Sequence, residues 1–175
     1  MLFKRKEYLP VSTRRNIYFS LIQSRIKYGI EVYANTSQIA LQPLNTANNR
    51  VLRTLQDQSR FCHVKQLYVN YNTIPLHLMH EFYLGKLIFK CLNCKPNYNS
   101  SNVMLSLFNQ NEASHSYSTR LSETNYLYAK SDKAFFKSYV FSSCRVWNNI
   151  PIIIRNANSV CSFSKLFRTH LLNTW

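Results

Sequence analysis

The sequence has little glycine, few acidic residues and no long apolar run. Only 2 Gly and 5 Pro occur in 175 residues, and because two-residue hairpin turns depend on glycine, the scarcity favours helices over hairpins. No stretch approaches the roughly 18 apolar residues that cross a bilayer, so we expect no membrane partner. The 5 Cys are odd in number and irregularly spaced, which argues against a disulfide framework.

The shortage of acids and glycines also limits catalysis. Two-metal phosphoryl transfer needs clustered carboxylates, but Asp57 and Asp132 lie far apart and the five Glu are scattered. Gly29 and Gly85 cannot form a glycine-rich phosphate loop. The composition does not exclude a Ser or Cys nucleophile with a His base, although no G-x-S-x-G motif supports one. We expect no enzyme activity from this chain alone, and no cofactor.

What the sequence has in abundance is positive charge and aromatic residues. Hydrophobic residues make up 46%, including 11 Phe and 12 Tyr, enough for the core of an ordered domain. Lys and Arg number 22 against 7 Asp and Glu, a net charge of +15. Such a body repels itself unless an anion compensates; nucleic acid is the usual one, and anionic membrane or plain solubility are the alternatives.

The amino-terminal segment does not resemble a signal peptide. Lys4, Arg5 and Lys6 are followed by Glu7 and Pro10 rather than by an apolar stretch. We therefore expect an intracellular protein, nuclear or cytoplasmic and not secreted, with reduced thiols.

Hydrophobic periodicity predicts a first amphipathic helix that starts at Ser12 or Thr13 and stops before Gly29, which supplies a left-handed residue. At 100° per residue, one face should be buried and the other exposed. The predicted buried face is Ile17, Tyr18, Leu21, Ile22 and Ile26, and the exposed face is Asn16, Ser20, Gln23 and Lys27.

Two further helices are predicted in the first half of the chain. One covers residues 43–56, with Pro43 in its first turn and Arg50 and Arg53 exposed; its predicted buried stripe is Leu44, Ala47, Val51 and Leu55. The next covers 73–93, with Thr73 as cap and Pro75 in the first turn, and is apolar nearly all round. This third helix should be the most buried one.

The pattern weakens beyond residue 100. We predict a short helix over 101–108, a polar loop over 109–119 and a strand within 120–130. A helix should end near Asn149, because the residue before Pro151 is pushed to extended geometry. In the last helix, Ser162 is the predicted cap, and Phe163, Leu166, Phe167 and His170 share one face opposite Lys165 and Arg168. The fold class is therefore mainly α, with a helical bundle over 1–110 and a small, irregular α/β part over 111–175.

One set of residues has the ligand types of a zinc site. His77, His80, Cys91 and Cys94 read H-x2-H…C-x2-C. On one continuous helix, however, His80 and Cys91 lie about 16 Å apart along the axis, so four ligands converge only if the helix breaks at Gly85. We interpret these residues as packing and expect no metal; a zinc-dependent module is the alternative.

Cations recur at helix ends and exposed faces of the first half, where they could contact phosphates without reading sequence. For each one the alternative is simple solvation. The candidate residues are Arg14, Arg15, Arg25, Lys27, Arg50, Arg53, Arg60 and Lys65.

Five motifs in order resemble a known family. They are "YLPVSTRRNIYFSLIQSRIKYGIEVY" (8–33), "NNRVLRTL" (48–55), "YNTIPLHLMHEFYLGKLIFK" (71–90), "HSYSTR" (115–120) and "RVWNNIP" (145–151). Their order and spacing resemble the region after the catalytic palm in reverse transcriptases of LINE-type non-LTR retrotransposons, nearest to the jockey and related groups. Tyr33 stands where that family usually has Trp, and Asn48 where it has Gln.

The resemblance implies a thumb-like helical bundle that grips primer and template, with RNA or an RNA–DNA duplex as a sequence-tolerant partner. It adds Arg120 to the candidate binding residues and gives Tyr28, Gly29, Trp147, Asn148 and Pro151 structural roles. Fingers, palm and the paired catalytic aspartates are absent, so the chain resembles a truncated copy. Base stacking is the alternative role for Trp147, and a helical protein-interaction scaffold without nucleic-acid binding is the alternative function.

Overall fold

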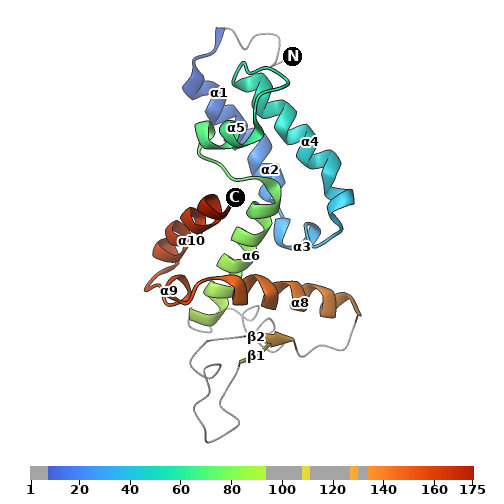
Figure 1. Ribbon diagram of the computed structural model, residues 1–175, viewed down its shortest axis with the longest axis vertical. Helices are drawn as coiled ribbons and strands as arrows, with labels where there is room; N and C mark the ends of the chain where they lie inside the picture. The colour runs from blue at the N-terminus through green and yellow to red at the C-terminus, as the bar shows by residue number, and fades with distance from the viewer. Residues whose placement is uncertain (1–7, 94–107, 111–126, 130–133) are drawn as a thin grey trace, which may run out of the picture. The chain divides into compact units, whose positions relative to one another are not determined.

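A computed structural model describes residues 8–93, 108–110, 127–129 and 134–175, and it is mainly helical, as predicted (Figure 1). The chain divides into two compact units, residues 1–80 and 81–175. This division falls inside a helix and earlier in the chain than the boundary at 110/111 expected from the sequence. The two units are called the N-terminal and C-terminal units below.

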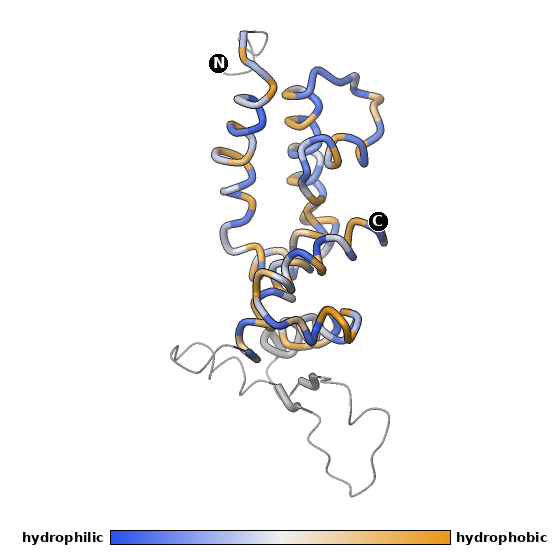
Figure 2. Tube along the Cα trace, turned by 90° about the vertical axis from the view of Figure 1, so that its left-hand side faces the viewer, coloured by the Kyte–Doolittle hydropathy of each residue, from blue (hydrophilic) through white to orange (hydrophobic). Residues whose placement is uncertain are grey.

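The helices of the N-terminal unit are α1 (Val11–Ile17), η2 (Tyr18–Gln23), α2 (Ser24–Lys27), α3 (Ile30–Tyr33), α4 (Gln38–Leu55) and α5 (Val64–Tyr71). Helix α6 (Leu76–Asn93) begins in this unit and continues into the next. The C-terminal unit adds α8 (Ala134–Asn149), α9 (Ile152–Arg155) and α10 (Val160–Thr174). In Figure 2, hydrophilic and hydrophobic positions interleave along the helices, as expected for elements that bury one face.

One short antiparallel ladder accompanies these helices. Strand β1 (Phe108–Gln110) pairs with β2 (Leu127–Ala129), with Phe108 opposite Ala129. The strand predicted within 120–130 is therefore present. Phe108 starts a strand rather than ending a helix, and residues 101–107 and 111–119, where a helix and a loop were predicted, lie outside the described residues.

The first predicted helix contains a π-helical middle, η2, between α1 and α2. The backbone N–H of Ser24 donates to the carbonyl of Phe19, five residues earlier, which is the π-helical pattern. The wider turn rotates the residues that follow it relative to an ideal α-helix. The buried face predicted at 100° per residue is therefore wrong at two positions: Leu21 is 50% exposed and Gln23 is buried. Gln23 Nε2 donates to Thr73 Oγ1 at 2.8 Å. Tyr18 and Ile26 are buried as predicted.

The end of this helix was predicted correctly, but the role of Tyr28 was not. Gly29 adopts φ +66°, the left-handed conformation that favours glycine. Tyr28, one residue earlier, has already left helical geometry, with ψ 112°. Its side chain is 88% exposed, so the structural, packing role expected for Tyr28 is wrong.

Helix α4 begins earlier and buries a different stripe than predicted. Ser37 caps it by accepting a hydrogen bond from the Ala40 N–H at 3.4 Å, so Pro43 lies inside the helix rather than in its first turn. The buried residues are Asn48, Leu52 and Leu55. Of the predicted stripe only Leu55 is buried; Leu44 and Val51 are intermediate and Ala47 is exposed.

A chain of buried hydrogen bonds explains this rotation of α4. Tyr18 OH donates to Asn48 Oδ1 (3.1 Å), Asn48 Nδ2 donates to Tyr68 OH (3.0 Å), and Tyr68 OH donates to Asn49 Oδ1 (2.6 Å). Desolvation raises the pKa of both phenols, which keeps them protonated as donors. Because the Asn48 amide finds partners on both sides, it can occupy a position that the periodicity assigned to an apolar residue.

Helix α5 was not predicted. It is only eight residues long and no side chain caps it, so its stability comes from tertiary contacts. Leu67, Tyr68 and Tyr71 are buried, and Gln56 Nε2 donates to the Leu67 carbonyl at 2.8 Å.

Helix α6 is the predicted third helix, and most of its apolar side chains are buried. It begins at Leu76 directly after Pro75, whose carbonyl accepts from the Met79 N–H at 2.8 Å. Thr73 lies further back and does not cap it; its hydroxyl accepts from Gln23 instead. A scaffold would need an exposed apolar surface to bind a partner, and the buried residues of α6 do not offer one.

Aromatic rings fill the core of the C-terminal unit. Phe163 stacks on Phe89 with centroids 4.3 Å apart and lies 6.3 Å from the ring of Trp147. Helix α8 ends at Asn149, as predicted. Helix α10 is capped by Ser159, not by Ser162: the Ser162 N–H donates to Ser159 Oγ at 3.1 Å.

The buried face of α10 differs from the predicted one at its edge. Phe163 and Phe167 are buried as predicted, but the third buried residue is Leu171. Leu166 is 43% exposed, and His170 is intermediate.

Gly85 serves close packing within this unit. A Cβ at this position would lie 2.7 Å from Cε1 of Phe167 and 3.0 Å from Cδ1 of Ile150. Glycine therefore lets α6 approach these side chains.

The Asn48→Leu substitution should destabilise the protein by about 2 kcal/mol, because the Tyr18 hydroxyl loses its acceptor inside the core. Thermal unfolding of the full chain measures this. Asn70→Leu is the matched control, since Asn70 is exposed and hydrogen-bonds only at the surface. Equal melting temperatures for the two variants would contradict the role of the buried chain.

The Gly85→Ala substitution should destabilise by about 1 kcal/mol net, because overpacking against Phe167 outweighs the better helix propensity of alanine. Adding Phe167→Leu should make the double variant less destabilised than the sum of the two single variants. Strict additivity in chemical denaturation would show that the two positions do not clash.

Candidate nucleic-acid interface

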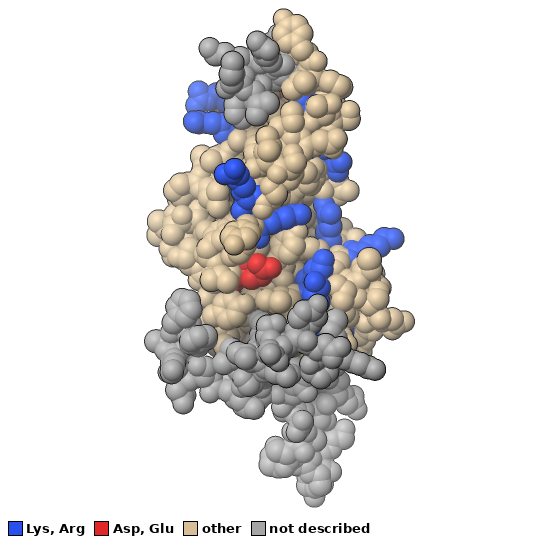
Figure 3. Space-filling model, turned by 180° about the vertical axis from the view of Figure 1, so that it is seen from behind, with Lys and Arg blue, Asp and Glu red and all other residues tan. Residues whose placement is uncertain are grey.

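The described part of the N-terminal unit is strongly cationic. Its only described acids are Glu31 and Asp57, and its cations are Arg14, Arg15, Arg25, Lys27, Arg50, Arg53, Arg60 and Lys65. On the face drawn in Figure 3, Lys and Arg groups outnumber acidic groups. The structure then separates these candidates by what each side chain contacts.

Arg14 and Arg15 bind the ends of neighbouring helices. Arg14 NH1 donates to the carbonyl of Leu55, the last residue of α4, at 3.0 Å, and also pairs with Asp57. Arg15 Nε donates to the carbonyl of Tyr71, the last residue of α5, at 3.2 Å. Helix C-termini carry unsatisfied carbonyls and partial negative charge, which cations stabilise. These two arginines therefore have a structural contact that sequence reasoning missed.

Three other candidates have interactions within the protein. Arg53, predicted to be exposed, is intermediate in exposure, and its NH2 donates to the Cys62 carbonyl at 3.4 Å. Lys27 is intermediate and Lys65 exposed, and both have an interaction within the protein.

The remaining candidates present their charge to solvent. Arg25, Arg50 and Arg60 are exposed. Arg60 lies over the ring of Phe61, 5.5 Å from its centroid. For Arg25 and Arg50, no hydrogen bond or ion pair of the guanidinium occurs among the described residues. Arg120 lies outside the described residues.

Two exposed aromatic side chains stand beside these cations. Tyr28 is 88% exposed and follows Lys27 in the chain, and Phe61 is 86% exposed and follows Arg60. Exposed rings beside cations suit the stacking of unpaired bases. Neither ring was a binding candidate from the sequence, because the exposure of an aromatic side chain depends on how the chain folds.

The aromatic cluster near the carboxyl terminus is packing. Trp147 is 1% exposed, so its ring cannot stack on a base in this fold. Asn148 is intermediate, and Pro151 precedes α9, where its carbonyl accepts from the Ile154 N–H at 2.9 Å.

Three of the candidate zinc ligands, His77, His80 and Cys91, lie on one uninterrupted helix. Helix α6 runs through Gly85 without a break, and Cys94 lies outside the described residues. Among the residues that the structure describes, no three His, Cys, Asp or Glu side chains are grouped to hold a metal. Desolvation lowers the pKa of His77, so its imidazole is neutral at pH 7.

The C-terminal unit has a small polar hollow of about 350 Å³ beside Glu81, Arg145 and His170. Desolvation raises the pKa of the Glu81 carboxyl, and the nearby Arg145 opposes the shift. The carboxyl offsets the cation at this hollow, which makes it a weaker phosphate site than the exposed arginines of the N-terminal unit.

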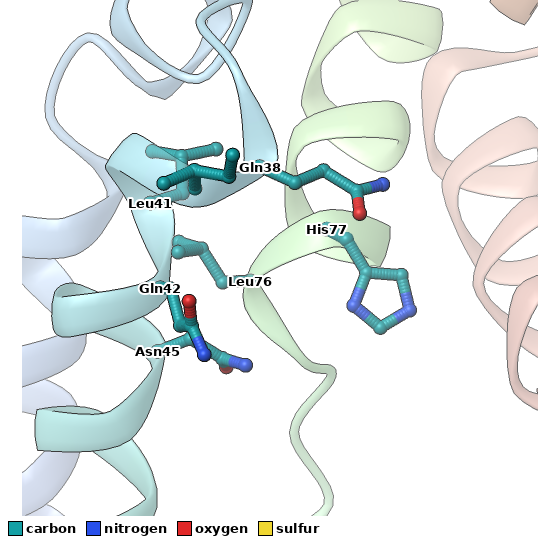
Figure 4. Close-up of a pocket in the computed structure, with 7 residues that line it drawn as sticks. Gln38, Leu41, Gln42, Asn45, Leu76 and His77 are labelled. Carbon is teal, nitrogen blue, oxygen red and sulfur yellow. The ribbon is translucent and has the colours of Figure 1, made fainter.

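A larger cavity, of about 540 Å³, lies in the N-terminal unit between the start of α4 and the start of α6. Its polar lining is Gln38, Gln42, Asn45 and His77. In Figure 4 the Gln38 side chain extends from α4 toward α6, where His77 lies, and Leu76 extends from α6 toward α4. The three amides were not candidates from the sequence, since uncharged amides spread along a helix form no recognisable motif, and His77 was considered only as a zinc ligand.

No family model, curated protein or solved structure matches this chain. Among the described residues, no helix combines the length and apolar character needed to cross a membrane.

The Trp147→Ala substitution should destabilise the protein by about 3 to 5 kcal/mol, as expected for truncating a buried aromatic residue. Thermal melting combined with nucleic-acid titration below the melting temperature tests this. A variant that melts normally but binds less tightly would contradict the packing role.

Proposed function

We propose that this protein is a nucleic-acid-binding helical module without a catalytic centre of its own, which holds RNA or an RNA–DNA duplex with little sequence preference. The observation that carries the proposal is the exposure of Arg25 and Arg50 with no carboxylate against either guanidinium among the described residues. Charge that is not neutralised within the protein is available to phosphates.

The pattern of contacts suits backbone recognition. Phosphate contacts position a protein on nucleic acid, whereas base contacts specify sequence. Arg25, Arg50 and Arg60 stand on three different segments of the N-terminal unit, so together they can follow a backbone. Exposed Tyr28 and Phe61 add surfaces on which unpaired bases can stack, which favours single-stranded stretches of a template.

The resemblance to the thumb region of non-LTR reverse transcriptases supports the same proposal. In such a parent, the palm would supply the paired aspartates and this region would hold primer and template. Tyr18 and Asn49, two positions that carry the resemblance, both take part in the buried hydrogen-bond chain. Binding of this kind would take place inside the cell, in the nucleus or the cytoplasm.

Binding should weaken steeply with salt, with a log–log slope of about −0.7 per phosphate neutralised on a single strand or −0.9 on a duplex. Removing two exposed cations, in Arg25→Gln/Arg50→Gln, should make the slope shallower by about 1.4 on a single strand. Fluorescence anisotropy with a labelled RNA of about 12 nucleotides, titrated between about 50 and 300 mM salt, measures the slope for the wild type and for the double variant.

Arg14→Gln is the contrasting variant, because it removes one cation that already has internal partners. It should lower the melting temperature through the lost contacts at the end of α4, while leaving the salt slope of the folded protein nearly unchanged. A wild-type protein that is well folded and binds no RNA at the lowest salt would overturn the proposed function and leave the scaffold alternative.

A further inference from the structure

The cavity between α4 and α6 is lined by neutral hydrogen-bonding groups rather than by charges. Gln38, Gln42 and Asn45 carry amides, each of which can both donate and accept. His77 adds an imidazole whose pKa is lowered by desolvation. A lining of this chemistry suits an uncharged ligand that has donors and acceptors on its edge.

The rest of the lining is apolar. Ile39, Leu41 and Leu76 complete the wall, and a flat ring can lie against such side chains. At about 540 Å³, the cavity falls in the range of small-molecule sites and is large enough for a purine.

One polar atom in this wall lacks a partner. Asn45 Oδ1 is buried and accepts no hydrogen bond. Turning the Asn45 amide to accept from a ligand N–H in the cavity therefore breaks no hydrogen bond of this oxygen within the protein.

A second hollow continues from the cavity along α4. It shares Ile39 and Gln42 with the first and ends at Arg50. Ile39, Gln42, Thr46 and Arg50 are spaced by three and four residues, so they form one stripe of the helix. From Gln42 to Arg50 the axis advances about 12 Å, which places a solvent-exposed cation within reach of the backbone that carries a bound base.

We infer that this cavity binds an unpaired nucleobase of single-stranded nucleic acid, with Arg50 holding a phosphate of the same strand. The inference rests on the proposed function and deepens it, because it adds base recognition to backbone binding. An uncharged, planar, donor- and acceptor-bearing group attached to an anionic chain satisfies all parts of the surface at once.

Adenine matches the amides of the lining. Asn and Gln amides pair with adenine through its N6 donor and N7 acceptor, and the N6 amino group can donate to Asn45 Oδ1. Uracil has no exocyclic amine, and its donor is the ring N3–H between two carbonyl oxygens. Unpaired bases are commonly read in this way, with the ring against a side-chain face and the edge hydrogen-bonded.

The experiment compares two single-stranded RNAs of equal length and charge, oligoadenylate and oligouridylate 12-mers, by anisotropy at fixed salt with the full chain. The wild type should prefer oligoadenylate by about tenfold, the value of one good amide–adenine pair. In Asn45→Leu the preference for oligoadenylate should disappear, while the salt slope stays that of the wild type. The two RNAs differ in how strongly their own bases stack. Because the wild type and the variant are titrated with the same two RNAs, this difference cancels when the preference of the variant is divided by that of the wild type.

Asn45→Leu should remain folded, because it removes a buried acceptor that has no partner in the protein; its melting temperature is measured alongside. Gln42→Leu is a second variant, with the same expected loss of preference. Gln66→Leu is the matched control: Gln66 is an exposed glutamine on α5, outside the cavity, and should keep the preference.

The outcomes separate the two proposals. Equal binding of the two RNAs by the wild type, with a steep salt dependence, overturns the base site and leaves the proposed function standing. A preference that survives in both Asn45→Leu and Gln42→Leu also overturns the base site. Failure of the folded wild type to bind either RNA overturns both proposals.

Discussion

The arrangement of the N-terminal unit depends on the hydrogen-bond chain from Tyr18 through Asn48 to Tyr68. It links η2, α4 and α5 through polar groups that must be satisfied once they are removed from water. The chain fixes the rotation of α4 about its axis. With Asn48 turned inward, Arg50, two residues further on, faces solvent. The buried amide therefore determines which cation of this helix can meet an external anion.

The same unit uses chemically identical side chains for two purposes. Arg14 and Arg15 neutralise the carbonyl ends of α4 and α5, whereas Arg25 and Arg50 remain in solvent. The difference lies in the partners: the guanidinium groups of Arg14 and Arg15 reach the carbonyl ends of neighbouring helices, and no such contact of Arg25 or Arg50 occurs among the described residues. A strongly basic composition can thus stabilise the fold and still leave charge for a partner.

Sequence patterns located most helices and several of their ends. Gly29 and Asn149 end helices where local backbone preferences place the stops. Errors arose where tertiary contacts overrode the periodicity. In η2 the π-helical turn exposes Leu21 and buries Gln23. In α4 the hydrogen bonds of Asn48 to two tyrosines bury a different set of residues than the periodicity predicts. Helix α5 was not predicted because eight residues give too short a pattern, and Tyr28 was given a structural role from its place in the motif that carries the family resemblance, although its side chain is exposed.

By itself the sequence determined a mainly helical chain with too few acids to balance its cations, because propensity and charge are local properties that each residue carries with it. Only the tertiary structure decided which arginines are occupied internally, since carbonyl partners such as those of Leu55 and Tyr71 lie 41 and 56 residues away in the chain. The cavity of Gln38, Gln42, Asn45 and His77 was decided in the same way. Its walls come from two helices, and no pattern within either one reveals what the other brings to it.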